Sequence, residues 1–211
     1  MKFRSFALIL LCLGCLGISR DQTKIILNIA AIDWCPQICP QSKEKPGYLV
    51  EIIQQLFKHS PYQVKIQTYP WSRAIRLVRH GSANALLSPA KEEAPDLFYH
   101  KVPLSYQTHC FFKNRGNLWS YQGEEELLKR NIIIYRDHSY GEILKNYLDK
   151  KDMKKLILTY DETYLDKSIK SINLNRADAF LFTVNSVTHH LLTNNIQSVE
   201  QDKCIKKIPP I

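Results

Sequence analysis

The sequence predicts an α/β protein with two lobes, each built on a mostly parallel sheet, and a cleft between the lobes. Short runs of β-branched and apolar residues alternate with segments whose apolar residues recur at helical spacing. This alternation occurs twice, before and after an extended stretch at Val102–Phe112. Strands that alternate with helices indicate β-α-β units and parallel sheets, so two such series indicate two lobes.

The first series predicts the elements of the first lobe, residues 20–103. Helical spacing recurs from Leu49 to Phe57 and from Trp71 to Val78, and Gly81 ends the second of these helices. The expected strands are Lys24–Ala31, Gln63–Tyr69, Ala83–Leu87 and Leu97–Tyr99.

The second series predicts the elements of the second lobe, residues 104–204. Its expected strands are Asn131–Tyr135, Leu156–Thr159 and Ala177–Phe182. Its expected helices are Gly123–Lys129, Gly141–Leu148, Thr163–Asn175 and Val184–Leu192.

Residues 1–19 predict a cleavable secretory signal. Lys2 and Arg4 precede an apolar run that is shorter than the ~20 residues a spanning helix needs. Cleavage after Ser19 is favoured over lipidation at Cys15, because Cys12 stands where a lipobox normally has Leu. We therefore expect a periplasmic protein.

Removal of the signal leaves four cysteines, and an even number in an oxidising compartment favours disulfides. Cys35 and Cys39 can close a small loop if the backbone turns back at Pro36, and Cys110 and Cys204 then pair by elimination. The alternative is a zinc site, for which Cys-x3-Cys without a second Cys or His pair is poor spacing.

The charge of the chain does not indicate nucleic acid. Its 29 Lys and Arg against 20 Asp and Glu give a formal +9 at pH 7 over 211 residues. These charges are spread, and no groove-reading helix or aromatic-rich sheet motif accompanies them, which indicates a solvated surface.

Motifs of enzymes and metal proteins are equally missing from the sequence. No nucleophile–base pair, nucleotide-binding loop or defensible pair of carboxylates occurs, so we expect neither an enzyme nor a cofactor. His189 and His190 point about 100° apart on a helix and lack a spaced acidic partner, so we expect no metal.

The expected ligand site lies at the carboxyl ends of the strands and between the lobes, where α/β proteins bind their ligands. Four loops meet this condition: Asp33–Pro36, Tyr69–Arg73, Ser88–Lys91 and Arg136–Gly141.

The order of motifs at these loops carries a family resemblance. Asp33-Trp34-Cys35-Pro36 ends a strand, and Gly47–Glu51 and Tyr69–Ala74 open the next two helices. Ser139-Tyr140-Gly141 and Asn175–Ala179 follow in the second lobe. From residue 24 to about residue 195 the chain resembles periplasmic (extracellular) solute-binding proteins of the amino-acid-type class. The resemblance implies a type II periplasmic binding protein-like fold that closes on a small polar solute, with the permease of an ABC-type importer as partner.

The chain departs from this family in three places. Members that bind α-amino acids usually place an Arg where this chain has Ser88–Glu93, and Lys91 cannot reproduce its bidentate contact with a carboxylate. They also usually place an Asp where Leu181–Asn185 offers only Thr183 and Asn185. Relative to the family we expect the chain to be C-terminally short: residues 205–211 would begin a return to the first lobe that the family completes with a further strand and helix.

Seven residues are the candidate ligand contacts. Trp34 and Trp71 follow strands and are either aromatic walls of the site or core residues. Arg73, in a first helical turn, either contacts an anion or is solvated or paired. Ser139 and Tyr140 lie where helix N-terminal N–H groups can bind an anionic group, and Ser139 can cap the helix as well. The full set is Trp34, Trp71, Arg73, Ser88, Ser139, Tyr140 and Thr183.

The predicted function is that of an exported, monomeric solute-binding protein for a small polar solute, either amino-acid-like or another small anion. The first alternative is a dehydratase-like periplasmic enzyme on the same fold. The second is a truncated, non-binding accessory or sensor-type protein.

Overall fold

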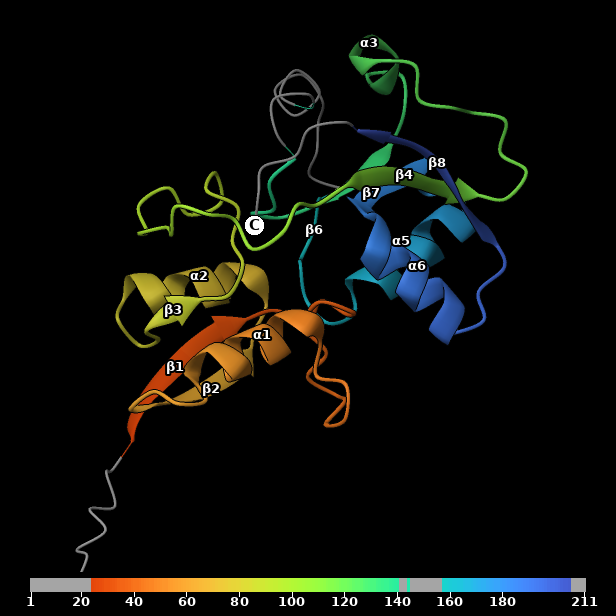
Figure 1. The fold of residues 1–211 in the computed structure, drawn as a ribbon. Coiled ribbons are helices and arrows are strands. Elements are labelled where there is room, and N and C mark those ends of the chain that lie inside the picture. The colour runs from red at the N-terminus through yellow and green to blue at the C-terminus, as the bar shows by residue number, and fades with distance from the viewer. Residues whose placement is uncertain (1–23, 141–143, 145–156, 206–211) are drawn as a thin grey trace, which may run out of the picture.

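A computed structural model describes residues 24–140, 144 and 157–205, which form two lobes (Figure 1). The first lobe has a parallel sheet of strand order β2-β1-β3. Helix α1 packs against β2, and α2 packs against β1 and β3. The bounds are β1 (Ile25–Ala31), α1 (Tyr48–Phe57), β2 (Tyr62–Thr68), α2 (Trp71–Arg79) and β3 (Ala85–Leu86).

The second lobe has a sheet of strand order β6-β5-β7-β4-β8. Strand β5 pairs in parallel with β6 and β7, whereas β4 pairs antiparallel with β7 and β8. The bounds are β4 (His109–Asn114), α3 (Glu124–Leu127), β5 (Ile132–Tyr135), β6 (Ile157–Leu158), α5 (Tyr164–Asn173), β7 (Ala179–Thr183), α6 (Val184–Thr193) and β8 (Val199–Ile205).

The fold class is that expected, and most predicted elements are confirmed within a few residues. The strand predicted at Leu97–Tyr99 is wrong: this segment forms no strand, and the Tyr99 hydroxyl donates to the Ala94 carbonyl at 2.9 Å instead. Strand β8 was not predicted, because charged residues interrupt its apolar pattern. Ile205 is its last residue and pairs with His109.

Several predictions concern residues beyond those described. The signal at residues 1–19, the end of the chain at 206–211 and nearly all of the helix expected at Gly141–Leu148 lie outside the described residues. Among the described helices, none has the length and apolar character needed to cross a membrane.

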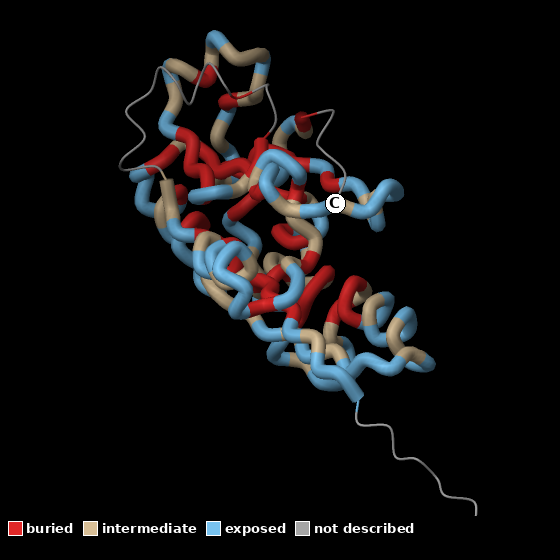
Figure 2. Tube along the Cα trace, turned by 90° about the vertical axis from the view of Figure 1, so that its left-hand side faces the viewer, coloured by how far each residue is buried: buried red, intermediate tan, exposed pale blue. Residues whose placement is uncertain are grey.

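The core of the second lobe follows from two short, wholly apolar strands. Every residue of β5 and of β7 is buried, which is typical of central strands covered on both faces. Helices α5 and α6 pack against β7 (Figure 1), and the Phe112 and Phe180 rings stack with centroids 5.3 Å apart. In both lobes the buried residues lie between the exposed surfaces (Figure 2).

Two disulfides join the four cysteines as predicted. Cys110–Cys204 links β4 to β8, and Cys35–Cys39 closes the loop that follows β1. Within that loop an isolated bridge pairs Trp34 with Ile38. The closed loop therefore presents Asp33 and Cys35 at the carboxyl end of β1.

The residue before α1 fixes this loop against the helix. Gly47 has φ +104°, and a Cβ at this position would lie 2.4 Å from the Gln37 carbonyl oxygen. The same carbonyl accepts the Leu49 N–H at 3.1 Å, so loop and helix share a tight backbone contact. Only glycine permits both the approach and the backbone angle.

We predict that Gly47→Ala destabilises the fold by about 3 kcal/mol or more, because a strained φ adds to a backbone clash. Gly116→Ala is the matched control, since Gly116 has φ +84° but open space around its Cβ position. It should cost only about 1–2 kcal/mol for the backbone angle. Urea unfolding measures both, and equal losses would contradict the assignment of a clash at Gly47.

Candidate functional site

The two lobes contact each other through loops at the carboxyl ends of their strands. The Trp71 backbone N–H donates to the Tyr160 carbonyl at 2.9 Å, and its indole N–H donates to the Asp137 carbonyl at 3.1 Å. The Ser72 hydroxyl donates to the Asp137 carboxylate. The segment Tyr69–Arg73 of the first lobe thus meets Asp137 and Tyr160 of the second.

A buried carboxylate, Glu93, makes a second contact between the lobes. Its Oε1 accepts the Ser139 N–H at 2.8 Å and lies 2.9 Å from Nδ1 of His138. Its Oε2 accepts the Ala90 N–H at 3.0 Å. The side chains of Glu93 and His138 are each only 3% exposed, so this contact is shielded from water.

His138 in turn contacts His109 of β4, with their Nε2 atoms 2.9 Å apart. Burial, together with the neighbouring His138, lowers the pKa of His109 well below its usual value, so His109 is neutral. The donor and acceptor roles depend on the tautomers; in an arrangement consistent with both contacts, His109 Nε2–H donates to His138 Nε2, and His138 Nδ1–H donates to Glu93. The buried His109 Nδ1 has no partner among the described residues.

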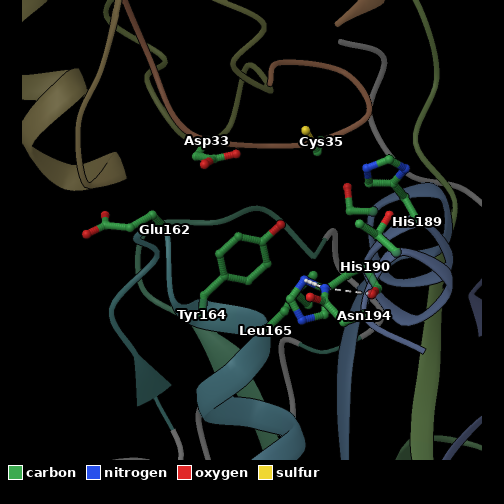
Figure 3. A pocket seen from close by; sticks show the side chains of 10 residues that line it. Asp33, Cys35, Glu162, Tyr164, Leu165, His189, His190 and Asn194 are labelled. Atoms are coloured by element: carbon green, nitrogen blue, oxygen red, sulfur yellow. Dashed lines mark hydrogen bonds between the residues drawn. The ribbon is translucent and has the colours of Figure 1, made fainter. Parts of the chain in front are cut away.

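A pocket of about 200 Å³ lies between the two lobes (Figure 3). The loop after β1 contributes one wall, and the start of α5 and one side of α6 contribute the others. The lining residues are Asp33, Cys35, Glu162, Tyr164, Leu165, Ser186, His189, His190, Thr193 and Asn194.

Carboxylates from both lobes set the charge of this pocket. Burial raises the pKa of Asp33 to about 6, and the negative charge of Glu162 adds to the rise, while the Cys35 N–H opposes it. Glu162 is exposed at the edge of the pocket. Two carboxylates that repel each other indicate that a positively charged group would be stabilised here.

Hydrogen-bonding groups line the remaining walls. The Tyr164 hydroxyl points toward the loop of Asp33 and Cys35 (Figure 3). Burial raises the Tyr164 pKa well above its usual value, so the hydroxyl remains a neutral donor and acceptor. His190 is held by Asp166, with Nε2 3.0 Å from Oδ1, and His189 belongs to the same helix. The pocket can therefore hold a polar solute that carries a cationic group.

The first-lobe candidates from the sequence are not among the residues that line this pocket. Trp34 and Trp71 are each 3% exposed and belong to the core, and Trp71 also joins the two lobes. Arg73 is exposed, with its guanidinium 5.2 Å from the centroid of the Tyr69 ring. The Ser88 hydroxyl is buried without a partner among the described residues, and Ser88 has φ +62°.

The second-lobe candidates are engaged in internal hydrogen bonds. Ser139 donates to Glu93, as described above, and the Tyr140 hydroxyl accepts the Tyr135 N–H at 2.8 Å. The Thr183 hydroxyl donates to Oε1 of Gln107 at 3.1 Å. The structure thus brings Trp71 and Ser139 to the contact between the lobes.

The sequence patterns did not single out Glu93, Asp33 or Tyr164. Glu93 ends the Ser88–Glu93 segment in which family members usually have an arginine, and an acid in place of that base is a signal of a polar site. Asp33 belongs to the predicted Asp33–Pro36 loop but is not among the predicted ligand contacts, although an acid directly after a buried strand favours a site. Tyr164 gave no signal, since its position follows the apolar spacing of a core residue.

The described residues include no group of three or more His, Cys, Asp or Glu side chains placed to hold a metal ion.

Comparisons with known proteins identify the fold alone. No family model and no curated protein matches the sequence. An ancestral arginine-binding protein bound to arginine is similar, with a TM-score of 0.68 at 13% identity over 89% of this chain and 83% of that one.

Two further solved structures have the same fold. An ABC uptake transporter substrate-binding protein from Streptococcus pneumoniae with bound histidine has a TM-score of 0.63 at 10% identity, over 84% of this chain and 74% of that one. A histidine kinase sensor domain with similarity to periplasmic binding proteins has a TM-score of 0.65 at 14% identity, over 87% of this chain and 78% of that one. The chain therefore has a type II periplasmic binding protein-like fold, as expected from its motifs.

We predict that Asp33→Asn stabilises the chain at pH 7 by about 1–2 kcal/mol, a figure that allows for the partial exposure of Asp33. The folded-state pKa of Asp33, about 6, exceeds the ordinary 3.8. The folded state therefore binds this proton more tightly, and wild-type stability falls as pH rises from about 4 to about 6.

The gain from Asp33→Asn should vanish below about pH 4, where Asp33 is protonated in both states. Asp96→Asn is the control with the opposite sign, because the hydrogen bond from Arg79 lowers the pKa of Asp96. Urea unfolding between pH 4 and pH 8 tests both variants. An Asp33→Asn chain that is less stable than wild type at pH 7 would refute the assigned repulsion.

Proposed function

We propose that this chain is an exported solute-binding protein that captures a small polar solute in the pocket between Asp33 and Tyr164. One observation carries the proposal: the pocket takes its walls from both lobes, with Asp33 and Cys35 on one side and Tyr164 and Ser186 on the other. A solute bound there contacts both lobes at once. Its binding energy can then favour the closed arrangement of the lobes.

The dimensions and charge of the pocket favour an amino-acid-like or amine solute over a simple anion. A volume of about 200 Å³ lies below the 300–1,000 Å³ of sites for drug-sized ligands. Asp33 and Glu162 would stabilise an ammonium or guanidinium group. In agreement with this, two of the similar structures contain arginine or histidine.

We further propose a periplasmic location and delivery of the solute to the permease of an ABC-type importer. The motifs of the N-terminal segment, the two disulfides and the similarity to an uptake-transporter protein support this role. A sensory role is the second candidate. It is favoured by the similarity to a histidine kinase sensor domain and by the contacts that already join the lobes.

An enzymatic role has less support. The raised pKa of Asp33 is a property that catalytic acids share. However, the Ser186 hydroxyl contacts Gln37 and Tyr164 rather than a histidine, so it is not an activated nucleophile. The similar structures named above are binding and sensor proteins. We therefore assign the acidity of Asp33 to recognition of a cationic group.

Thermal unfolding of the purified mature chain should reveal the solute class. We expect the midpoint to rise with cationic solutes such as arginine, histidine or a diamine, and not with glutamate or phosphate. Asp33→Asn should weaken binding by about 10- to 100-fold, the loss of a charge-assisted contact.

Glu51→Gln is the matched control for this measurement, because Glu51 is an exposed acid on α1 that lies outside the pocket. It should leave the affinity unchanged. Stabilisation by anions alone would refute the proposed charge preference. A chain that no solute of a broad polar library stabilises would refute solute binding itself.

A further inference from the structure

We propose that Glu93 is a tethered carboxylate ligand. It occupies an anion-binding site formed jointly by the two lobes, and so holds them together without any solute. This inference concerns the Glu93 contact, whose residues are not among those that line the pocket, and does not depend on the identity of the solute.

The first argument is the set of donors around the carboxylate. Three N–H groups converge on its two oxygens: Ser139 at 2.8 Å and His138 at 2.9 Å on Oε1, and Ala90 at 3.0 Å on Oε2. Two of these donors belong to the second lobe, whereas Glu93 and Ala90 follow β3 of the first. Such converging donors are those that a free carboxylate would require.

Burial of the Glu93 carboxylate makes separation of the lobes costly. With its side chain 3% exposed, Glu93 has exchanged nearly all its water for protein donors. A carboxylate without such donors would be costly to bury, so the two lobes cannot separate slightly without leaving polar groups unsatisfied. The contact should therefore be either fully formed or fully broken, unlike an exposed ion pair, which can loosen gradually.

The two donors of the second lobe are held in place by groups other than Glu93. His109 holds the ring of His138 from behind, and the rings of Tyr160 and Phe182 lie with centroids 5.2 Å from it. Asp137, which precedes His138, has φ +58°, and its carbonyl accepts a hydrogen bond from the Trp71 indole of the first lobe. The donors should therefore persist when the Glu93 carboxylate is removed, and leave a site that a small free carboxylate can enter.

Two consequences distinguish this site from an ordinary salt bridge. A solute carboxylate cannot reach the Ser139 N–H while Glu93 occupies it. Conversely, truncation of Glu93 should convert an internal contact into a binding site for acetate or formate.

Chemical rescue tests the proposal with the mature chain. Glu93→Ala should lower the midpoint of thermal unfolding by several degrees, and sodium acetate should restore part of the loss in a saturable manner. Sodium chloride at equal ionic strength should not restore it. The wild type and Glu92→Ala, the exposed neighbouring acid, should show no specific response to acetate.

Equal responses to acetate in the wild type and Glu93→Ala, or no response in either, would overturn the proposal. Glu93→Gln covers the case in which the truncated chain does not fold, because it keeps the volume and one acceptor. It should unfold at a lower temperature, show no acetate response, and have a larger radius of gyration in X-ray scattering. An unchanged midpoint and radius for Glu93→Gln would also overturn the proposal. None of these measurements involves a pocket solute, so they can fail or succeed separately from the proposed function.

Discussion

Three polar groups that are buried where the lobes meet have a partner on the opposite lobe. The Trp71 indole needs the Asp137 carbonyl, the Glu93 carboxylate needs the Ser139 N–H, and the Gln37 amide donates to the Ser186 hydroxyl at 3.1 Å. A buried donor or acceptor without a partner is costly, so these three pairs specify one arrangement of the lobes. The pocket between Asp33 and Tyr164 exists because that arrangement brings its two walls to a fixed separation.

The same constraint explains the electrostatics of the site. Glu93 is matched by three N–H groups, whereas Asp33 has the Cys35 N–H and faces the like charge of Glu162. One carboxylate is thus satisfied internally and the other is destabilised, although both lie between the lobes. Glu93 therefore stabilises the contact between the lobes, whereas Asp33 is available to a solute.

Much of the fold could be predicted from the sequence, because buried strands and amphipathic helices leave local patterns. The apolar run of β5 and the spacing of Trp71, Ala74 and Ile75 in α2 are of this kind. Strand β8 could not be predicted in the same way, since its pairing with β4 stabilises a segment with alternating charges.

The candidate site was predictable only at the level of its loops. Pairs such as Glu93 with Ser139 lie 46 residues apart, and no local pattern encodes which residue a side chain reaches across such a separation. Trp34 was predicted as a ligand contact but is a core residue. A tryptophan after a strand fits a binding site and a core equally well, and here packing placed it in the core.

The bond between Cys110 and Cys204 has a mechanical consequence. It joins the neighbouring strands β4 and β8, which are the first and last strands of the second lobe in chain order, across a sequence separation of 94. Tension applied to the two flanks of the lobe would pass through this covalent bond and bypass the chain between its ends. The helices that carry Tyr164 and Ser186 would then bear no tension transmitted along the backbone, which protects their half of the pocket from stretching of the chain.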